Sequence, residues 1–355
     1  ETGNNTVSLY DKRLVQNTNL EHDLNYGVWN KLLKIDQNAF VLQYSGSSSD
    51  GYLQTFTTSS DGNTITQVLE KEWGTKNDVY YPSFIRMSED TYLIAYYGYN
   101  SGIKHDGTSV SNTWGQWLSV FQIKSDGSVI NELGNFLHDT YTNSDPYNDL
   151  IKIDDDTYAL AYKSYNYGPQ TSGSWGGWIK TFKVNGGNIN QVNELQHYTS
   201  SDSYWHSWER LSATTYALAW QGSGGDGYIT TFTISTDGAT ITEISELEHD
   251  GNNGSYNSFA KLDDDTYVLA YTGDGSDGHI STFTIPTNGA SITKVATLEH
   301  DNSYGIFNSL VRIDQNKFML AYKASDNDGH VKMFAIPDDG SSITVSYTHL
   351  RAHET

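Results

Sequence analysis

A segment of about fifty residues recurs six times along this chain, and a repeat of that length limits the possible folds more than any other feature of the sequence. Each copy opens with an aromatic residue followed by a short apolar run, and the copies begin at Trp29, Tyr81, Tyr147, Trp205, Tyr256 and Phe307. One such unit is too small to bury its own apolar face. Neighbouring copies must therefore pack against one another.

Each copy contains four β-like pieces. The second piece alternates apolar and polar residues, as in Thr157–Tyr162, and the third runs from Gly278 to Ile285 in the fifth copy. An Asp-Gly or Asn-Gly turn such as Asp237-Gly238 leads into the fourth piece, and no helical period persists. The pattern predicts an all-β fold, a six-bladed β-propeller of four-stranded antiparallel blades. A parallel β-helix is the alternative, but its coils are shorter.

The two ends of the repeat region are complementary. Residues 14–23 resemble the fourth strand of a copy, because Leu20–Asp23 repeats the sequence of Leu298–Asp301. The last copy keeps only Ser342–Thr344 of its own fourth strand. We therefore expect the N-terminal strand to complete blade six and close the ring, which would remove the open sheet edges. A seven-bladed or incomplete propeller is the alternative, and a seventh blade would need another copy.

Two terminal pieces stand outside the repeat. Glu1-Thr2-Gly3 resembles the scar of a secretory expression vector, and residues 345–355 resemble translated sequencing-adapter read-through. We expect one propeller domain over residues 4–344 and no evolved function in the tail 345–355.

The repeat core combines Tyr-Asn-Ser-Leu, Lys-Ile-Asp, Thr-Tyr-x-Leu-Ala-Tyr and Thr-Phe-Thr-Ile. It resembles uncharacterised propeller-type repeats of bacterial and metagenomic surface proteins. The resemblance implies an exported protein, extracellular or at the cell surface, and implies no particular activity.

Composition narrows the possible partners. The chain has 43 acidic and 21 basic residues, a net charge of −22, which argues against binding to nucleic acid. No apolar run is long enough for a membrane span, so we expect no membrane insertion. We also expect a monomer in solution. The chain has no cysteine, which excludes disulfides, thiolate nucleophiles and Cys-ligated zinc.

One basic residue recurs near the end of the first strand in every copy. These residues are Lys34, Arg86, Lys152, Arg210, Lys261 and Arg312. They could form structural ion pairs with nearby acids or with a neighbouring blade, or they could form a ring that holds an anion in the channel. The three arginines fall in alternate blades and resemble the arginine cluster of sialidases, but the sequence does not place the other catalytic residues of a sialidase.

A second column carries a His-Asp pair at the end of the fourth strand, as in His249-Asp250 and His300-Asp301. Because fourth strands lie at the rim of a propeller, these pairs are too far apart to share a metal ion. We expect both side chains to cap the following turn with local hydrogen bonds. The Asp-rich loops near Asp277 and Asp328 are possible calcium ligands without an EF-hand pattern, so we expect no metal or other cofactor.

Departures from the repeat cluster in blades two to four and indicate added function. Trp114 and Trp175 lie on extended loops and have no counterpart in the simple blades, whereas Trp117, Trp178 and Trp208 replace core residues. Aromatic rings amid Asn, Ser and Gly suit the stacking of sugar rings. We therefore expect a binding module for a glycan or another surface polymer, without catalysis. The candidate ligand contacts are Tyr81, Trp114, Trp175, Trp205, His206, Asp149 and Glu209.

Two other functions stay open. A carbohydrate-active enzyme, a glycoside hydrolase or a lyase, would need an acid and a base at the channel mouth, for which Glu209, His206 and Asp149 are candidates. A purely structural or adhesive repeat domain would show a featureless loop face, and the similarity of blades five and six favours it.

Overall fold

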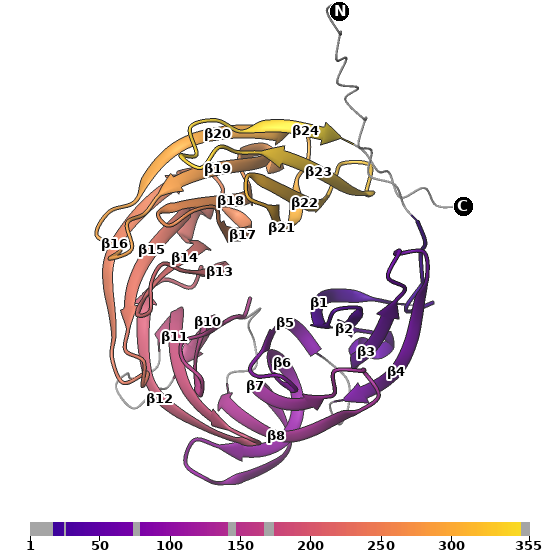
Figure 1. The fold of residues 1–355 in the computed structure, drawn as a ribbon. Coiled ribbons are helices and arrows are strands. Elements are labelled where there is room, and N and C mark those ends of the chain that lie inside the picture. Colours follow the sequence, from indigo (N-terminus) through magenta and orange to yellow (C-terminus); the bar gives the residue numbers. More distant parts are fainter. Residues whose placement is uncertain (1–16, 25, 74–78, 141–146, 167–173, 349–355) are drawn as a thin grey trace, which may run out of the picture.

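The computed structural model describes residues 17–24, 26–73, 79–140, 147–166 and 174–348. Within these ranges the strands form six four-stranded antiparallel sheets that follow one another along the chain and are arranged as a six-bladed β-propeller (Figure 1). The predicted fold class is confirmed. None of the described residues forms a helix long and apolar enough to cross a membrane.

The blades are consecutive in sequence. Blade one contains β1 (Val28–Asp36), β2 (Ala39–Ser45), β3 (Gly51–Thr58) and β4 (Ile65–Trp73). Blade two contains β5 (Val79–Arg86), β6 (Thr91–Lys104), β7 (Ser109–Ile123) and β8 (Ile130–Asp139). Blade three contains β9 (Asp149–Lys152), β10 (Thr157–Asn166), β11 (Ser174–Asn185) and β12 (Asn188–Tyr198).

The second half repeats this order. Blade four contains β13 (Tyr204–Arg210), β14 (Thr215–Gln221), β15 (Gly227–Ile234) and β16 (Ile241–Asp250). Blade five contains β17 (Ser255–Lys261), β18 (Thr266–Thr272), β19 (Gly278–Thr284) and β20 (Thr293–Asp301). Blade six contains β21 (Ile306–Asp314), β22 (Lys317–Lys323), β23 (Gly329–Ala335) and β24 (Thr344–Thr348). Short 3₁₀ turns, η1 (Ser47–Ser49), η2 (Ser223–Gly225) and η3 (Asp274–Ser276), follow the second strands of blades one, four and five.

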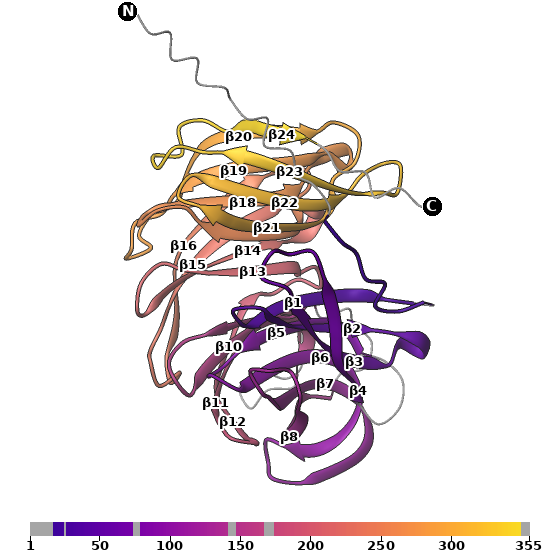
Figure 2. The same ribbon diagram turned by 45° about the vertical axis from the view of Figure 1, so that its right-hand side comes forward.

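Strand register defines two faces of the ring. The start of β1 pairs with the end of β2, through Val28 and Ser45, so the starts of the inner strands share a face with the turns between second and third strands. We call this the mouth face. The long hairpin of β6 and β7 extends on it, because Val79 pairs with Gly98 and the hairpin continues beyond that point. In Figure 1 the labelled first strands lie nearest the centre of the ring and the fourth strands outermost, and Figure 2 shows the same blades turned by 45°.

The core lies between blades rather than within one. Ile35 of blade one packs in one cluster with Phe84 and Tyr92 of blade two, and Ile153 of blade three packs with Trp208 of blade four. Strand alternation produces this arrangement, since successive side chains face opposite neighbouring blades. Trp117, Trp178 and Trp208 are buried as predicted. Complete burial of such a side chain contributes roughly 1.5–3 kcal/mol.

The outer strand of blade six corrects one prediction. It is β24, which pairs with β23 through Phe334 and Val345, and not the N-terminal segment. Residues 17–24 form no strand, and residues 14–16 lie outside the described residues. One edge of β23 can accept only one strand, and the segment that follows the turn at Gly340 is the nearer one in the chain. Residues 345–348, which we expected to stand outside the fold, therefore belong to blade six.

Candidate functional site

The mouth of the channel is ringed by the aromatic residue that opens each repeat copy. We call these residues the mouth column: Trp29, Tyr81, Tyr147, Trp205, Tyr256 and Phe307. From Trp29 to Phe307, each aromatic ring contacts that of the next blade, with ring centroids 3.7–4.7 Å apart. The first five rings are half-buried, and Phe307 at the end of the series is 48% exposed.

All six residues of the mouth column have a left-handed backbone, with φ between 48° and 56°. In five blades the pairing of the first and second strands shifts at this point, for example between Tyr204 and Ser207. A bulge with an unpaired residue in this conformation bends the strand, at a cost of about 1–2 kcal/mol for a side chain other than glycine. Because all six blades carry the left-handed residue, this conformation belongs to the repeat and gives the mouth its row of aromatic rings.

In blade two the extended hairpin continues this aromatic surface outward. Trp114 contacts Tyr97 and Tyr99, at centroid distances of 5.5 and 5.8 Å. Tyr97 in turn contacts Tyr80, the neighbour of Tyr81 in the chain, at 6.2 Å. Ring contacts thus lead from Trp114 to Tyr80, the chain neighbour of Tyr81, and all of these rings are half-buried.

Blade three has a matching surface with a buried cation. Trp175 contacts Tyr165, and the ammonium of Lys163 lies 5.6 Å from the centre of the Trp175 ring. Lys163 also lies 3.9 Å from the ring of Tyr204 and donates to its hydroxyl at 2.7 Å. Tyr204 contacts Tyr147 of the mouth column. Contacts thus link Trp175 through Lys163 and Tyr204 to Tyr147, which in turn contacts Trp205.

His206 is a structural bridge rather than an exposed contact. Its Nδ1 donates to the carbonyl of Tyr147 in the preceding blade at 2.9 Å, and its Nε2 accepts from Ser203 at the same distance. Asn148 and Asn257 make the equivalent bridge at other interfaces. Burial lowers the pKa of His206 to about 4, so the ring is neutral. Both of its nitrogens are occupied by the protein.

Two carboxylates of the site lie on neighbouring inner strands. Asp149 accepts from the backbone N–H of Trp208 at 2.8 Å and from Ser83 at 3.2 Å. Glu209 accepts from the backbone N–H of Arg210 at 3.1 Å. Burial raises the pKa of both carboxyls, that of Glu209 to about 7, and the charge of Asp149 adds to the effect on Glu209.

The basic column lies at the opposite end of the inner strands. Arg86, Lys152 and Arg210 each donate to a backbone carbonyl of the preceding blade, those of Ile35, Met87 and Lys152, at 2.8–2.9 Å. Arg312 donates to carbonyls in its own turn instead. No described interaction joins these cations to the mouth column. These contacts link neighbouring blades through backbone carbonyls rather than through the ion pairs that we expected; the ion pair described for this column joins Lys152 to Asp155 of its own blade at 3.5 Å.

The His-Asp column divides into two roles. Asp250 and Asp301 accept backbone N–H groups of the following turn, as predicted. The histidines do not cap. His249 and His300 are buried against Tyr271 and Tyr322 of the next blade, and their ring nitrogens have no hydrogen-bond partner among the described residues.

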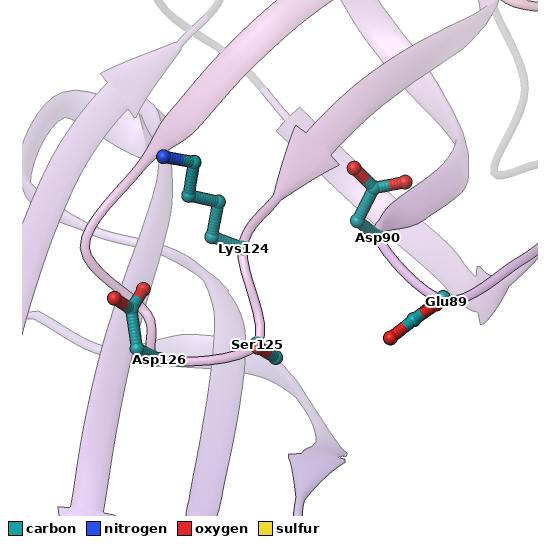
Figure 3. A pocket seen from close by; sticks show the side chains of 5 residues that line it. All are labelled: Glu89, Asp90, Lys124, Ser125 and Asp126. Atoms are coloured by element: carbon teal, nitrogen blue, oxygen red, sulfur yellow. The ribbon is translucent and has the colours of Figure 1, made fainter.

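One shallow polar pocket lies on the face opposite the mouth. Figure 3 shows Glu89 and Asp90, from the turn between β5 and β6, beside Lys124, Ser125 and Asp126. Asp90 accepts from Gln122 and Asp126 accepts from Ser128, so these acids have local partners. In the part of the chain that the structure describes, no group of three or more His, Asp or Glu side chains is arranged to hold a metal ion.

The residues that complete the blade three surface were missed by sequence reasoning. Lys163 and Tyr204 connect Trp175 to the mouth column. Tyr204 opens the part of blade four that departs from the repeat but was not among the candidate contacts, and Lys163 does not stand out as a departure. The position of Lys163 is occupied by Ser45, Tyr97, Gln221, Thr272 and Lys323 in the other blades. Because the residue at this position differs from blade to blade, a lysine there does not indicate an added function.

Comparison with known proteins identifies the fold only. No family model matches the chain, and no curated protein does. A protein from Lactobacillus plantarum matches with a TM-score of 0.58 and 11% identity over 89% of this chain and 82% of its own. A putative 6-phosphogluconolactonase from Bacteroides uniformis matches with a TM-score of 0.58 and 12% identity over 89% and 83%. The NanB sialidase from Streptococcus pneumoniae matches with a TM-score of 0.54 and 9% identity over 88% and 67%.

Proposed function

We propose that this protein is an extracellular binding module that holds a glycan on the mouth face of blades two to four. The observation that carries the proposal is the pair of contact series that lead from Trp114 to Tyr80, the chain neighbour of Tyr81, and from Trp175 through Lys163 and Tyr204 to Tyr147. Half-buried rings keep their positions without a ligand, which lowers the entropy cost of binding. The glycan surface consists of Tyr81, Trp114, Tyr147, Trp175 and Trp205.

A neutral sugar fits the chemistry of this surface better than a polyanion does. The apolar C–H face of a pyranose stacks on an aromatic ring, while its hydroxyls need polar partners close by. Asp149 follows Tyr147 by two residues and Glu209 follows Trp205 by four, and both carry carboxyl oxygens. The net charge of −22 disfavours polyanionic glycans and favours neutral ones. The sugar-related names among the propeller neighbours agree with this class of ligand.

A glycan array of neutral and acidic polysaccharide fragments tests the proposal. We expect a neutral glycan to bind, and Trp114→Ala and Trp175→Ala each to weaken binding about tenfold or more, a loss of at least about 1.4 kcal/mol. Leu133→Ala is the matched control, because Leu133 is an apolar residue of the outer strand β8 with 41% exposure. An array without any bound glycan would favour a structural or adhesive domain instead.

The raised pKa values of Asp149 and Glu209 favour a second candidate, a carbohydrate-active enzyme. A carboxyl with a pKa of about 7 beside a second carboxylate is suited to acid–base chemistry near neutral pH. The same array fragments, incubated with the protein and analysed for released sugars, separate the two candidates. Release that Glu209→Gln abolishes would identify an enzyme, whereas binding without release supports the binding module.

A further inference from the structure

The five interfaces between consecutive blades repeat one apolar contact. Near the middle of each inner strand from blade two onward, a large side chain faces the preceding blade. In chain order these side chains are Phe84, Leu150, Trp208, Phe259 and Leu310. Each packs near an apolar residue at the end of the preceding inner strand: Ile35, Met87, Ile153, Leu211 or Leu262. All ten of these side chains are less than 10% exposed.

Blade one carries one side chain of this apolar contact and blade six carries the other, and both side chains are exposed. Leu32, the equivalent of Phe84, is 61% exposed, and Ile313, the equivalent of Ile35, is 46% exposed. Within the described ranges no hydrogen bond, ion pair or ring contact joins blade six to blade one. These two faces lie at the two ends of the blade series in Figure 1.

Among the described residues, the hydrogen bonds that join neighbouring inner strands are likewise incomplete at blade one and blade six. At four interfaces a side-chain oxygen of one blade accepts a backbone N–H of the next, as Ser258 accepts from Leu310 at 2.9 Å. At the same interfaces an Asn or His donates to the carbonyl of the preceding mouth-column residue, as Asn308 does to Tyr256 at 3.3 Å. Ser309 of blade six repeats Ser258, and Asn30 of blade one repeats Asn308. Within the described part of the chain, Asn30 makes only the local bond, to the carbonyl of Gly27, which Asn257 and Asn308 also make to Gly254 and Gly305 beside their inter-blade bonds.

The segment before blade one indicates which kind of element would cover the exposed face of blade one. The ring of His22 packs on Tyr44 at 4.7 Å and 68°, just as His300 packs on Tyr322 at 4.8 Å and 71°. Asp23 accepts the backbone N–H of Tyr26, as Asp301 accepts that of Tyr304. Leu20–Asp23 therefore sits on blade one as the end of an outer strand of a preceding blade. That blade is not blade six, whose outer strand is β24.

We propose that the open faces of blade one and blade six form a docking site for a further β-unit, a three-stranded antiparallel sheet of the same repeat that completes its fourth strand with the segment ending at Asp23. The unit presents an apolar residue and an Asn toward blade six, to meet Ile313 and Phe307. It presents an apolar strand end and a Ser toward Leu32. Its sheet edge pairs with the N-terminal segment of this chain, so it is held from three sides.

The test uses the full chain and a polypeptide that copies residues 255–286, the first three strands of blade five. We expect a 1:1 complex by size-exclusion chromatography with light scattering. Leu32→Asp and Ile313→Asp each place a charge in one docking face and are expected to weaken the complex at least tenfold. Val192→Asp, at a rim position of β12 with 38% exposure, is the matched control and is expected to leave it unchanged.

A second measurement does not depend on the folding of the added polypeptide. The chain has no cysteine, so Leu32→Cys with Ile313→Cys gives a protein with two thiols only. We expect both thiols to react with a maleimide reagent and to form no intramolecular disulfide under oxidation. Rapid formation of that disulfide would show a ring closed on six blades and overturn the proposal. Absence of any complex with the polypeptide, or a dimer of the chain that Leu32→Asp disrupts, would overturn it as well.

Discussion

At the scale of single residues, the buried histidines of the outer strands couple stability to pH. His249 lies against Tyr271 and Phe283, and Lys294 donates to its backbone carbonyl at 3.1 Å. Burial lowers the pKa of His249 to about 3, and the nearby Lys294 charge acts in the same direction. Burial likewise lowers the pKa of His300 to about 3. Both rings are therefore neutral in the folded protein.

A lowered histidine pKa gives a definite sign to the pH dependence. The unfolded chain binds protons below its ordinary pKa of about 6.5, whereas the folded protein does not until about pH 3. The pH-dependent contribution of His249 to the free energy of unfolding is therefore fully present above about pH 6.5, and it is lost as the pH falls toward 3. We expect His249→Phe, which keeps an aromatic ring and removes two unpaired buried nitrogens, to unfold with a similar free energy at pH 7.5. At pH 4.5 its free energy of unfolding should exceed that of the wild type by on the order of 2–3 kcal/mol.

Urea denaturation at the two pH values measures this difference. The comparison of wild type and variant isolates one histidine, since the other histidines titrate equally in both proteins. An identical loss of stability in both proteins between pH 7.5 and pH 4.5 would show that His249 does not titrate as its environment implies.

At the scale of elements, the hairpin between third and fourth strands is hydrogen-bonded to the preceding blade at four of the five interfaces between consecutive blades. Thr231 in β15 donates to the carbonyl of Gly289, in the turn of the next blade, at 2.8 Å. Thr55, Thr181 and Thr282 make the same bond at 2.7–2.8 Å to Gly127, Gly238 and Gly340. The glycine is required because its φ is +69° at Gly289 and because an added Cβ would lie 3.0 Å from Thr215.

We expect Thr231→Val to lower the free energy of unfolding by about 1–2 kcal/mol, because valine keeps the shape of threonine and leaves the Gly289 carbonyl without its donor. Thr233→Val, two residues farther along β15, is the control and should change stability by less than about 0.5 kcal/mol. Thermal and urea unfolding of the two variants check the difference. Equal effects at both positions would mean that the bond to Gly289 contributes nothing beyond the β propensity of valine.

At the scale of the whole molecule, the repeat made the blade number and strand order predictable, since each copy carries its own inner strand and turn. The identity of the outer strand in blade six was not predictable, because the segments before Asp23 and after Gly340 have similar strand patterns and only the second one pairs with β23. Trp114 and Trp175 were recognisable as additions to a repeat. Lys163 and the left-handed bulge at Trp205 were not, since they become visible only when strands and blades are placed together.

The open ends of the blade series determine how stability is distributed around the ring. Blades three and four are each packed between two neighbours, whereas blades one and six each have one packed neighbour among the described residues. In an array held together by nearest-neighbour interfaces, a terminal unit opens with less free energy than a central one. We expect amide hydrogen exchange in β1 and β21 to be at least about tenfold faster than in β14, a difference of about 1.4 kcal/mol or more in opening free energy.

Hydrogen exchange followed by mass spectrometry resolves this gradient, because β1, β14 and β21 lie in separate stretches of the chain. Protection of Leu32 and its neighbours should rise when the docking polypeptide is added, while protection of β14 stays the same. Equal protection of β1, β14 and β21 in the chain alone would mean that the ring is closed in solution, and would count against the docking site together with the gradient.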